Sequence, residues 1–212
     1  MTASLDHLVL GSNDLERGIA WLEDRIGVRA VFGGAHPGRG THNALLKLGA
    51  RTYLEILAPD PSQAPQSRYP SLPTLEEPRL IAWAARCSDI EAQARMARAA
   101  GFAIIRPEGN SRTRTDGKIV RWKFFRLQDD RGGLLPFFIE WSRDSVHPST
   151  DAPTGCRLDR FVVRSAAHRE LGKACQDLGV DAVVEEGKEP LLRALISSPK
   201  GEIEITSRGS RP

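Results

Sequence analysis

The feature that most constrains the fold is a pattern of one strand, one helix and three further strands that occurs three times along the 212-residue chain. In the first copy, β-branched and aliphatic runs predict the strands. Asn13 or Asp14 caps the helix, whose apolar residues recur at helical spacing until Gly27 ends it. The strands of this copy are expected at 5–10, 28–32, 44–48 and 52–57.

Proline-containing segments separate the copies. Residues 59–78 carry six prolines, too many for a helix or a central strand, and a shorter segment spans 148–153. The second copy is predicted to have strands at 80–86, 102–105, 120–127 and 135–141, with a helix from Ser88 or Asp89 to Ala100. The third is predicted to have strands at 158–163, 180–184, 191–196 and 202–206, with a helix over 167–178.

A single β-α-β-β-β unit covers one face of its sheet with its helix and leaves the other face bare, so two units must combine. We therefore expect an α+β protein in which the first two modules, 1–58 and 79–147, form a cup within a domain of residues 1–150. The third module, 151–212, is expected to pack elsewhere or against its counterpart in a homodimer.

Composition narrows the class of protein. The sequence has no run of 18 apolar residues. Its net charge of +3 is small, and acidic and basic residues are interspersed along it. Three cysteines form no CxxC pair, which favours a reducing compartment. We expect a cytoplasmic protein that binds neither membrane nor nucleic acid. A basic stretch at 106–126 is either a solvated surface or an attractor of an anionic small molecule.

Two polar residues lie on strands of the first module where apolar residues are the rule. In "TYLEILA", Glu55 alternates with Leu54 and Ile56, so it faces the cup if those two residues pack on the helix. His7 in "LDHLV" alternates in the same way. A carboxylate in the cup must be paired, hydrated or bound to a metal, so His7 and Glu55 are predicted to meet on its inner face.

At these residues the chain resembles the glyoxalase-like domain family of the vicinal oxygen chelate superfamily, whose members include glyoxalase I, extradiol dioxygenases and bleomycin-resistance proteins. The resemblance rests on "LDHLVLGSNDLERGIAWLEDRIGV" and "GGAHPGRGTHNALLKLGARTYLEILAPDP". It implies a cup that holds a divalent metal (Zn, Ni, Fe, Mn or Co) between a His of each first strand and a Glu of each fourth strand. Carried over, it implies His7, Glu55 and Glu140, the last in "FFIEW".

The fourth ligand departs from the family pattern, because Ala82 stands where the second module should have a histidine. His42 is a candidate replacement, although the strand that carries it can instead turn Asn43 toward the cup. His36, in the glycine-rich loop, is another. In the third module, Arg160 and Glu204 occupy the corresponding places and predict an internal salt bridge.

Two functions follow from the resemblance. The first is a metal-dependent enzyme acting on a small carbonyl or oxygenated substrate by lyase, isomerase or dioxygenase chemistry, with Glu55 or Glu140 moving a proton. The second is a metal-free protein of the bleomycin-resistance type that binds or sequesters a small molecule. In either function, the substrate-binding residues are expected to be Arg39, Asn43, Trp122 and Phe138.

Overall fold

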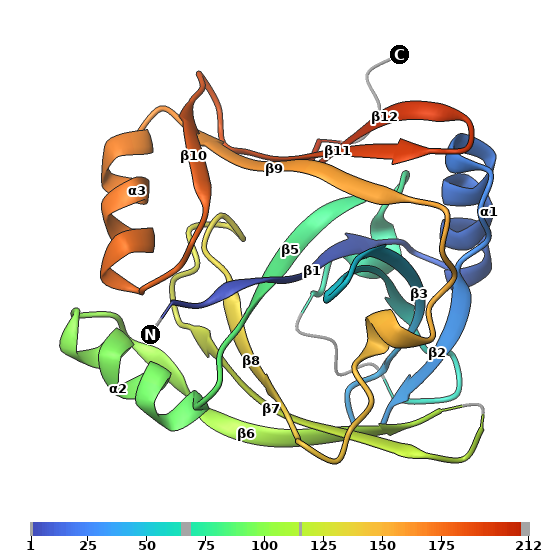
Figure 1. The fold of residues 1–212 in the computed structure, drawn as a ribbon, viewed down its shortest axis with the longest axis horizontal. Coiled ribbons are helices and arrows are strands. Elements are labelled where there is room, and N and C mark those ends of the chain that lie inside the picture. Colours follow the sequence, from blue (N-terminus) through green and yellow to red (C-terminus); the bar gives the residue numbers. More distant parts are fainter. Residues whose placement is uncertain (1, 65–68, 115, 209–212) are drawn as a thin grey trace.

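The computed structural model describes residues 2–64, 69–114 and 116–208, and these residues form three β-α-β-β-β modules (Figure 1). The first module contains β1 (Ser4–Gly11), α1 (Leu15–Ile26), β2 (Val31–His36), β3 (Thr41–Gly49) and β4 (Thr52–Pro59). The second contains β5 (Arg79–Arg86), α2 (Ile90–Ala99), β6 (Ile104–Thr113), β7 (Ile119–Leu127) and β8 (Phe137–Trp141). The third contains β9 (Arg157–Ser165), α3 (His168–Asp177), β10 (Val183–Glu186), β11 (Leu191–Ser198) and β12 (Gly201–Thr206). Short 3₁₀ helices lie at Leu72–Thr74 and Pro148–Thr150.

The first two modules share one curled sheet with the strand order β2-β3-β4-β1-β5-β8-β7-β6. In each half the first strand pairs in parallel with the fourth, and the two first strands, β1 and β5, pair with each other antiparallel. The halves therefore join along their first strands, which confirms the predicted cup (Figure 1). This arrangement places β1 and β4, which carry His7 and Glu55, side by side near the middle of the sheet.

Local capping explains where the first two helices begin. The side chain of Asp14 accepts a hydrogen bond from the Arg17 backbone N–H, and Asp89 does the same for Ala92. Gly27 ends α1 with a φ of 76°, a conformation that costs glycine little. Both helices turn their apolar stripe toward the sheet, so the opposite face of the sheet is left to line a cavity.

The third module has the predicted order of elements along the chain, but the strand order in its sheet differs from that of the first two modules. Its sheet runs β10-β9-β11-β12, so β11 separates β9 from β12. The predicted Arg160–Glu204 salt bridge is therefore wrong, because those residues lie on strands that are not neighbours. Arg160 instead pairs with Glu185 at 2.6 Å, and Glu204 pairs with Arg193 at 2.6 Å.

The apolar side of the third module packs on the first two modules of the same chain. Its sheet lies across β5 and the end of α1 (Figure 1), and the rings of Phe161 and Trp83 meet edge to face at 5.2 Å. A single hydrophobic core contains residues of all three modules. Packing against a second copy of the chain stays a prediction. Along the described part of the chain, none of the helices is both long enough and apolar enough to span a bilayer.

Candidate functional site

A cavity of about 140 Å³ opens on the side of the curled sheet that faces away from α1 and α2. Both modules line it, the first mainly with polar side chains and the second mainly with aromatic side chains and arginines. The lining residues are His7, Val9, His36, Arg39, Thr41, Asn43, Tyr53, Glu55, Leu57, Tyr69, Asn110, Arg112, Trp122, Phe124, Arg126, Phe137, Ile139 and Trp141.

His7 and Glu55 meet at the floor of this cavity. The register of β1 and β4 sets His7 opposite Tyr53 and Val9 opposite Glu55, so both side chains emerge on the same face of the sheet. His7 Nε2 lies 3.5 Å from Glu55 Oε2, and both side chains are almost completely buried. The Tyr53 ring stacks on the imidazole at a centroid distance of 4.5 Å and fixes its plane.

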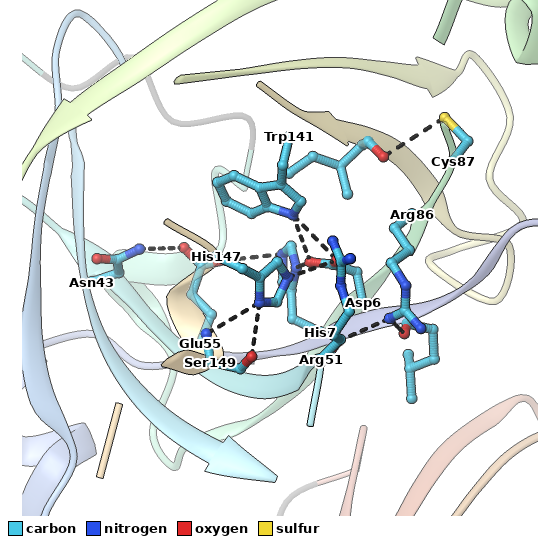
Figure 2. A network of polar contacts seen from close by, with 12 residues as sticks. Asp6, His7, Asn43, Arg51, Glu55, Arg86, Cys87, Trp141, His147 and Ser149 are labelled. Carbon is cyan, nitrogen blue, oxygen red and sulfur yellow. Dashed lines mark hydrogen bonds and ion pairs between the residues drawn. The ribbon is translucent and has the colours of Figure 1, made fainter. Parts of the chain in front are cut away.

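Asp6 joins this pair because the β1–β5 register shifts between Leu5 and His7. Such a bulge puts two consecutive side chains on nearly the same side of a strand. Asp6 is completely buried and binds three nitrogens (Figure 2): His7 Nδ1 at 2.8 Å, His147 Nε2 at 3.1 Å, and Trp141 Nε1 at 3.2 Å. An ionised carboxylate only accepts, so each of these nitrogens carries the hydrogen.

The charges of the His7–Glu55 pair follow from these contacts. Burial alone would lower the pKa of His7, but the hydrogen bonds and charges of Asp6 and Glu55 outweigh it and raise that pKa to about 9. Burial alone would raise the pKa of Glu55, but His7, with help from His36 and Asn43, lowers it to about 2. At neutral pH the cavity floor therefore holds an imidazolium beside a carboxylate.

Asn43 and His36 complete the polar side. Asn43 Nδ2 donates to Glu55 Oε1 at 2.6 Å and lies 3.2 Å from His36 Nε2, so this ring nitrogen accepts. His36 Nδ1 then carries the hydrogen and donates to Thr41 Oγ1 at 3.0 Å. Burial, with the charges of Arg112 and Arg39, lowers the pKa of His36 below its usual value, although Glu55 opposes this effect. His36 is thus neutral next to a charged His7.

The structure places three predicted site residues elsewhere. Glu140 and Phe138 lie on the helix-facing side of β8, whose other residues, Phe137, Ile139 and Trp141, line the cavity. Glu140 Oε2 accepts a hydrogen bond from the backbone N–H of Ile90 at 2.9 Å, and Phe138 stacks on Phe125 in the core at 4.8 Å.

His42 is the third. Its ring lies outside the cavity in an edge-to-face arrangement with Phe32, with the ring centroids 6.2 Å apart. The strand turns Asn43 inward instead, as the alternative interpretation of "THNALL" predicts. Arg39 and Trp122 line the cavity, where Arg39 pairs with Glu108 at 3.0 Å, and their role in substrate binding stays a prediction.

Glu140 has a structural task at the first turn of α2, where a carboxylate interacts favourably with the helix dipole. We expect Glu140→Gln to lower the free energy of unfolding by about 0.3–1 kcal/mol, since the amide loses the charge and keeps an accepting oxygen. Urea denaturation measures this change. Ligand binding in the cavity should be unaltered in the same variant, and a loss of binding would contradict this assignment.

The second module does not supply the metal ligands that the resemblance implies. In the first module, Glu55 lies opposite Val9, which is two residues after His7. In the second module, Phe137 lies opposite Ala84, which is two residues after Ala82. The counterparts of His7 and Glu55 are therefore Ala82 and Phe137, which have no donor atoms. Among the described residues, no group of three or more His, Cys, Asp or Glu side chains is arranged to hold a metal ion. The four-ligand metal site does not fit this chain.

Sequence reasoning also misses three site residues. Strict alternation puts Asp6 on the face opposite His7, and no local signal in "LDHLV" indicates the bulge. His147 lies in a proline-containing connection that fixes no direction. Arg112 is visible only as one of several cations between 106 and 126, although it alone among them is deeply buried, at 4% exposure.

Comparison with solved structures finds one that supports this architecture and weaker matches to others. A hypothetical protein from Staphylococcus aureus superposes with a TM-score of 0.67 at 17% identity, over 96% of this chain and 85% of that one. Methylmalonyl-CoA epimerase from Mycobacterium tuberculosis gives a TM-score of 0.46 at 26% identity, over 65% and 85%. The Streptomyces coelicolor methylmalonyl-CoA epimerase in complex with 2-nitronate-propionyl-CoA gives 0.48 at 16% identity, over 69% and 99%.

Sequence comparison supplies the family. No curated protein matches the chain. The sequence model of the glyoxalase-like domain matches residues 5–179, which include all but the first residue of the curled sheet and the start of the third module. The chain belongs to the glyoxalase-like domain family.

Proposed function

We propose that this protein is an enzyme that moves a proton on a small, oxygenated carbonyl compound, with Glu55 as the base and His7 as the hydrogen-bond donor. The observation that carries the proposal is the buried imidazolium–carboxylate pair at the floor of a cavity of ligand size. Strongly shifted pKa values in a cleft are typical of functional groups. The pair supports those isomerase and lyase reactions that begin with removal of a proton beside a carbonyl group.

In this proposal each group has a separate task. Asn43 holds Glu55 Oε1, which leaves Oε2 to take the proton. His7 Nε2–H points to the same place and can donate to the carbonyl oxygen as negative charge develops there. The carbonyl oxygen would draw His7 away from Glu55. Because His7 is what lowers the pKa of Glu55, its withdrawal raises that pKa and makes the carboxylate a stronger base.

The aromatic half of the cavity supports this chemistry by excluding water. Trp122 and Phe124 are each less than one-tenth exposed, and Phe137 touches His7 edge to face at 5.4 Å. Removing water strengthens the interaction of His7 with a developing oxyanion, since the local dielectric constant falls.

Exchange of carbon-bound hydrogen with solvent tests the proposal. The purified protein is incubated in D₂O with pyruvate, 2-oxobutanoate or dihydroxyacetone phosphate, and loss of the signal of the protons beside the carbonyl is followed by ¹H NMR. We expect exchange faster than in buffer with at least one compound. Exchange at the buffer rate with all three contradicts proton transfer on this class of compound.

Metal analysis of the same preparation tests whether the activity depends on a bound metal ion. A stoichiometric divalent ion that is lost in both His7→Ala and Glu55→Gln would show that the enzyme uses a metal despite its incomplete ligand set. Protein without metal that still catalyses exchange would show that the side chains suffice.

A second candidate function is the binding of a planar small molecule without turnover. It is favoured by the second module, whose described residues bring Trp122, Phe124, Phe137 and Trp141 to the cavity but no carboxylate or imidazole. Aromatic side chains of this kind stack on flat ligands. A ligand that binds stoichiometrically and is recovered unchanged after long incubation, with no solvent exchange, would identify this function.

A further inference from the structure

Arg112 is an unusual component of the cavity wall. Its side chain projects from β6 and is only 4% exposed, and it donates a hydrogen bond to the backbone carbonyl of Gly33 on β2. Burial lowers the pKa of this guanidinium, but arginine remains charged in proteins. In the part of the chain that the structure describes, no carboxylate lies within ion-pair distance of Arg112.

The other two arginines of the cavity have contacts that Arg112 lacks. Arg39 pairs with Glu108 at 3.0 Å and lies over the ring of Phe124. Arg126 donates to the Tyr69 hydroxyl at 2.7 Å and lies over the ring of Phe137 at 4.5 Å. An aromatic face attracts a cation, so Arg126 also has a source of negative potential. No such ring contact is found for Arg112 among the described residues.

A buried charge without a counter-ion is costly, and proteins ordinarily pair it. Glu55 is the sole carboxylate among the described lining residues, and His7 and Asn43 already bind its two oxygens. Arg112 therefore faces the cavity without an ion-pair partner of its own, and Glu55 offsets its charge only from beyond ion-pair distance. A guanidinium has donors in a planar fork that matches a carboxylate or phosphate group.

Close approach of two strands holds Arg112 in this place. Gly34, at a φ of 137°, lies so near β6 that a Cβ atom would stand 2.8 Å from the Thr113 carbonyl oxygen. The pair Gly33-Gly34 thus lets the edge strand β2 pass against β6 and brings the Gly33 carbonyl to Arg112. The position of the guanidinium is fixed by the backbone before any ligand binds.

We propose that Arg112 binds an anionic group, a carboxylate or a phosphate, of the ligand that occupies the cavity. The inference rests on the proposed function and narrows it: the substrate is a small organic acid or phosphate ester, held at Arg112 while Glu55 and His7 act on its carbonyl region. The carboxylate and phosphate forms share this chemistry, and two probes separate them.

The test is calorimetric titration with sodium pyruvate and with sodium phosphate at constant ionic strength. Wild-type protein should bind one of them, and Arg112→Gln should weaken that binding by about tenfold or more, which corresponds to about 1.4 kcal/mol. Arg126→Gln, in the same cavity, should weaken binding less than Arg112→Gln does, and the exposed Arg95→Gln on α2 is the control that should change the affinity by less than about twofold.

Three results overturn the proposal: no binding of either probe to the wild type, equal affinity in Arg112→Gln, or a larger loss in Arg126→Gln. Should Arg112→Gln fail to fold, Glu55→Gln decides, because removing the cavity's carboxylate must tighten anion binding at Arg112, and unchanged or weaker binding contradicts it. The same variant separates the two hypotheses. In Glu55→Gln, loss of exchange together with tighter anion binding supports both hypotheses, whereas anion binding without exchange in the wild type contradicts only the proton-transfer function.

Discussion

Glu55→Gln is expected to slow the exchange of the proton beside the carbonyl by about 10²–10⁴-fold, the usual contribution of a general base. Glutamine has the size and shape of glutamate, and its carbonyl oxygen can still accept from Asn43 Nδ2, which now binds Glu55 at 2.6 Å. The substitution therefore removes charge and basicity and leaves the cavity's shape. The protein should remain folded, with Tyr53 still stacked on His7.

The matched control is Glu108→Gln, which removes a carboxylate from Arg39 at the rim, away from the His7–Glu55 pair. This variant should keep its exchange rate within a few-fold of the wild type. Equal slowing in both variants would mean that the total charge of the cavity, and not the base, controls the rate. Exchange within tenfold of the wild type in Glu55→Gln would remove this residue from the mechanism.

The first half of the site is predictable from sequence because two simple rules act together. Alternation along a strand gives the face of each side chain, and the repeat places the first and fourth strands of a module side by side, so His7 and Glu55 had to converge. The rules fail for Glu140 because the phase of alternation on β8 depends on its register with β5. That register puts Phe137 inward and leaves Glu140 at the start of α2.

Interactions between distant segments explain the other differences. The sequence pattern of the third module predicts its strands and helix. Packing on β5 and α1 decides which of its strands are neighbours, and β11 lies between β9 and β12. The glycines at 33–34 read locally as a turn-rich loop. Glycine is needed there because β6 passes close to β2, and the sequence of residues 31–43 alone does not indicate this contact.

Asp6→Asn is expected to lower the pKa of His7 by more than one unit from its raised value of about 9. With the carboxylate gone, burial, which is the largest influence on His7 and acts to lower its pKa, is opposed by Glu55 alone. Asparagine also cannot accept from all three nitrogens. Its amide group would face His147 Nε2–H if it took the place of Oδ2, or His7 Nδ1–H if it took the place of Oδ1, donor against donor in either case.

The titration can be read directly from the imidazole nitrogens of ¹⁵N-histidine-labelled protein, with His7→Gln assigning the signal. Asp60→Asn is the matched control. Asp60 is also buried, but its carboxylate binds Ser62 and Gln63 and not His7. The His7 signal should titrate in this control as in the wild type. An unchanged His7 pKa in Asp6→Asn would show that Glu55 alone keeps the imidazolium charged.

Stability gives a second measure of the same link. The pKa of His7 is higher in the folded protein than the ordinary 6.5, so its contribution to stability is fully present below pH 6.5 and is lost as the pH rises through about 9. Wild-type protein should therefore lose stability over this range, and Asp6→Asn should lose less, since its folded and unfolded pKa values lie closer together. A slope as steep in Asp6→Asn as in the wild type would assign that loss to groups other than His7, because Asp6 is the partner that holds the proton on Nδ1.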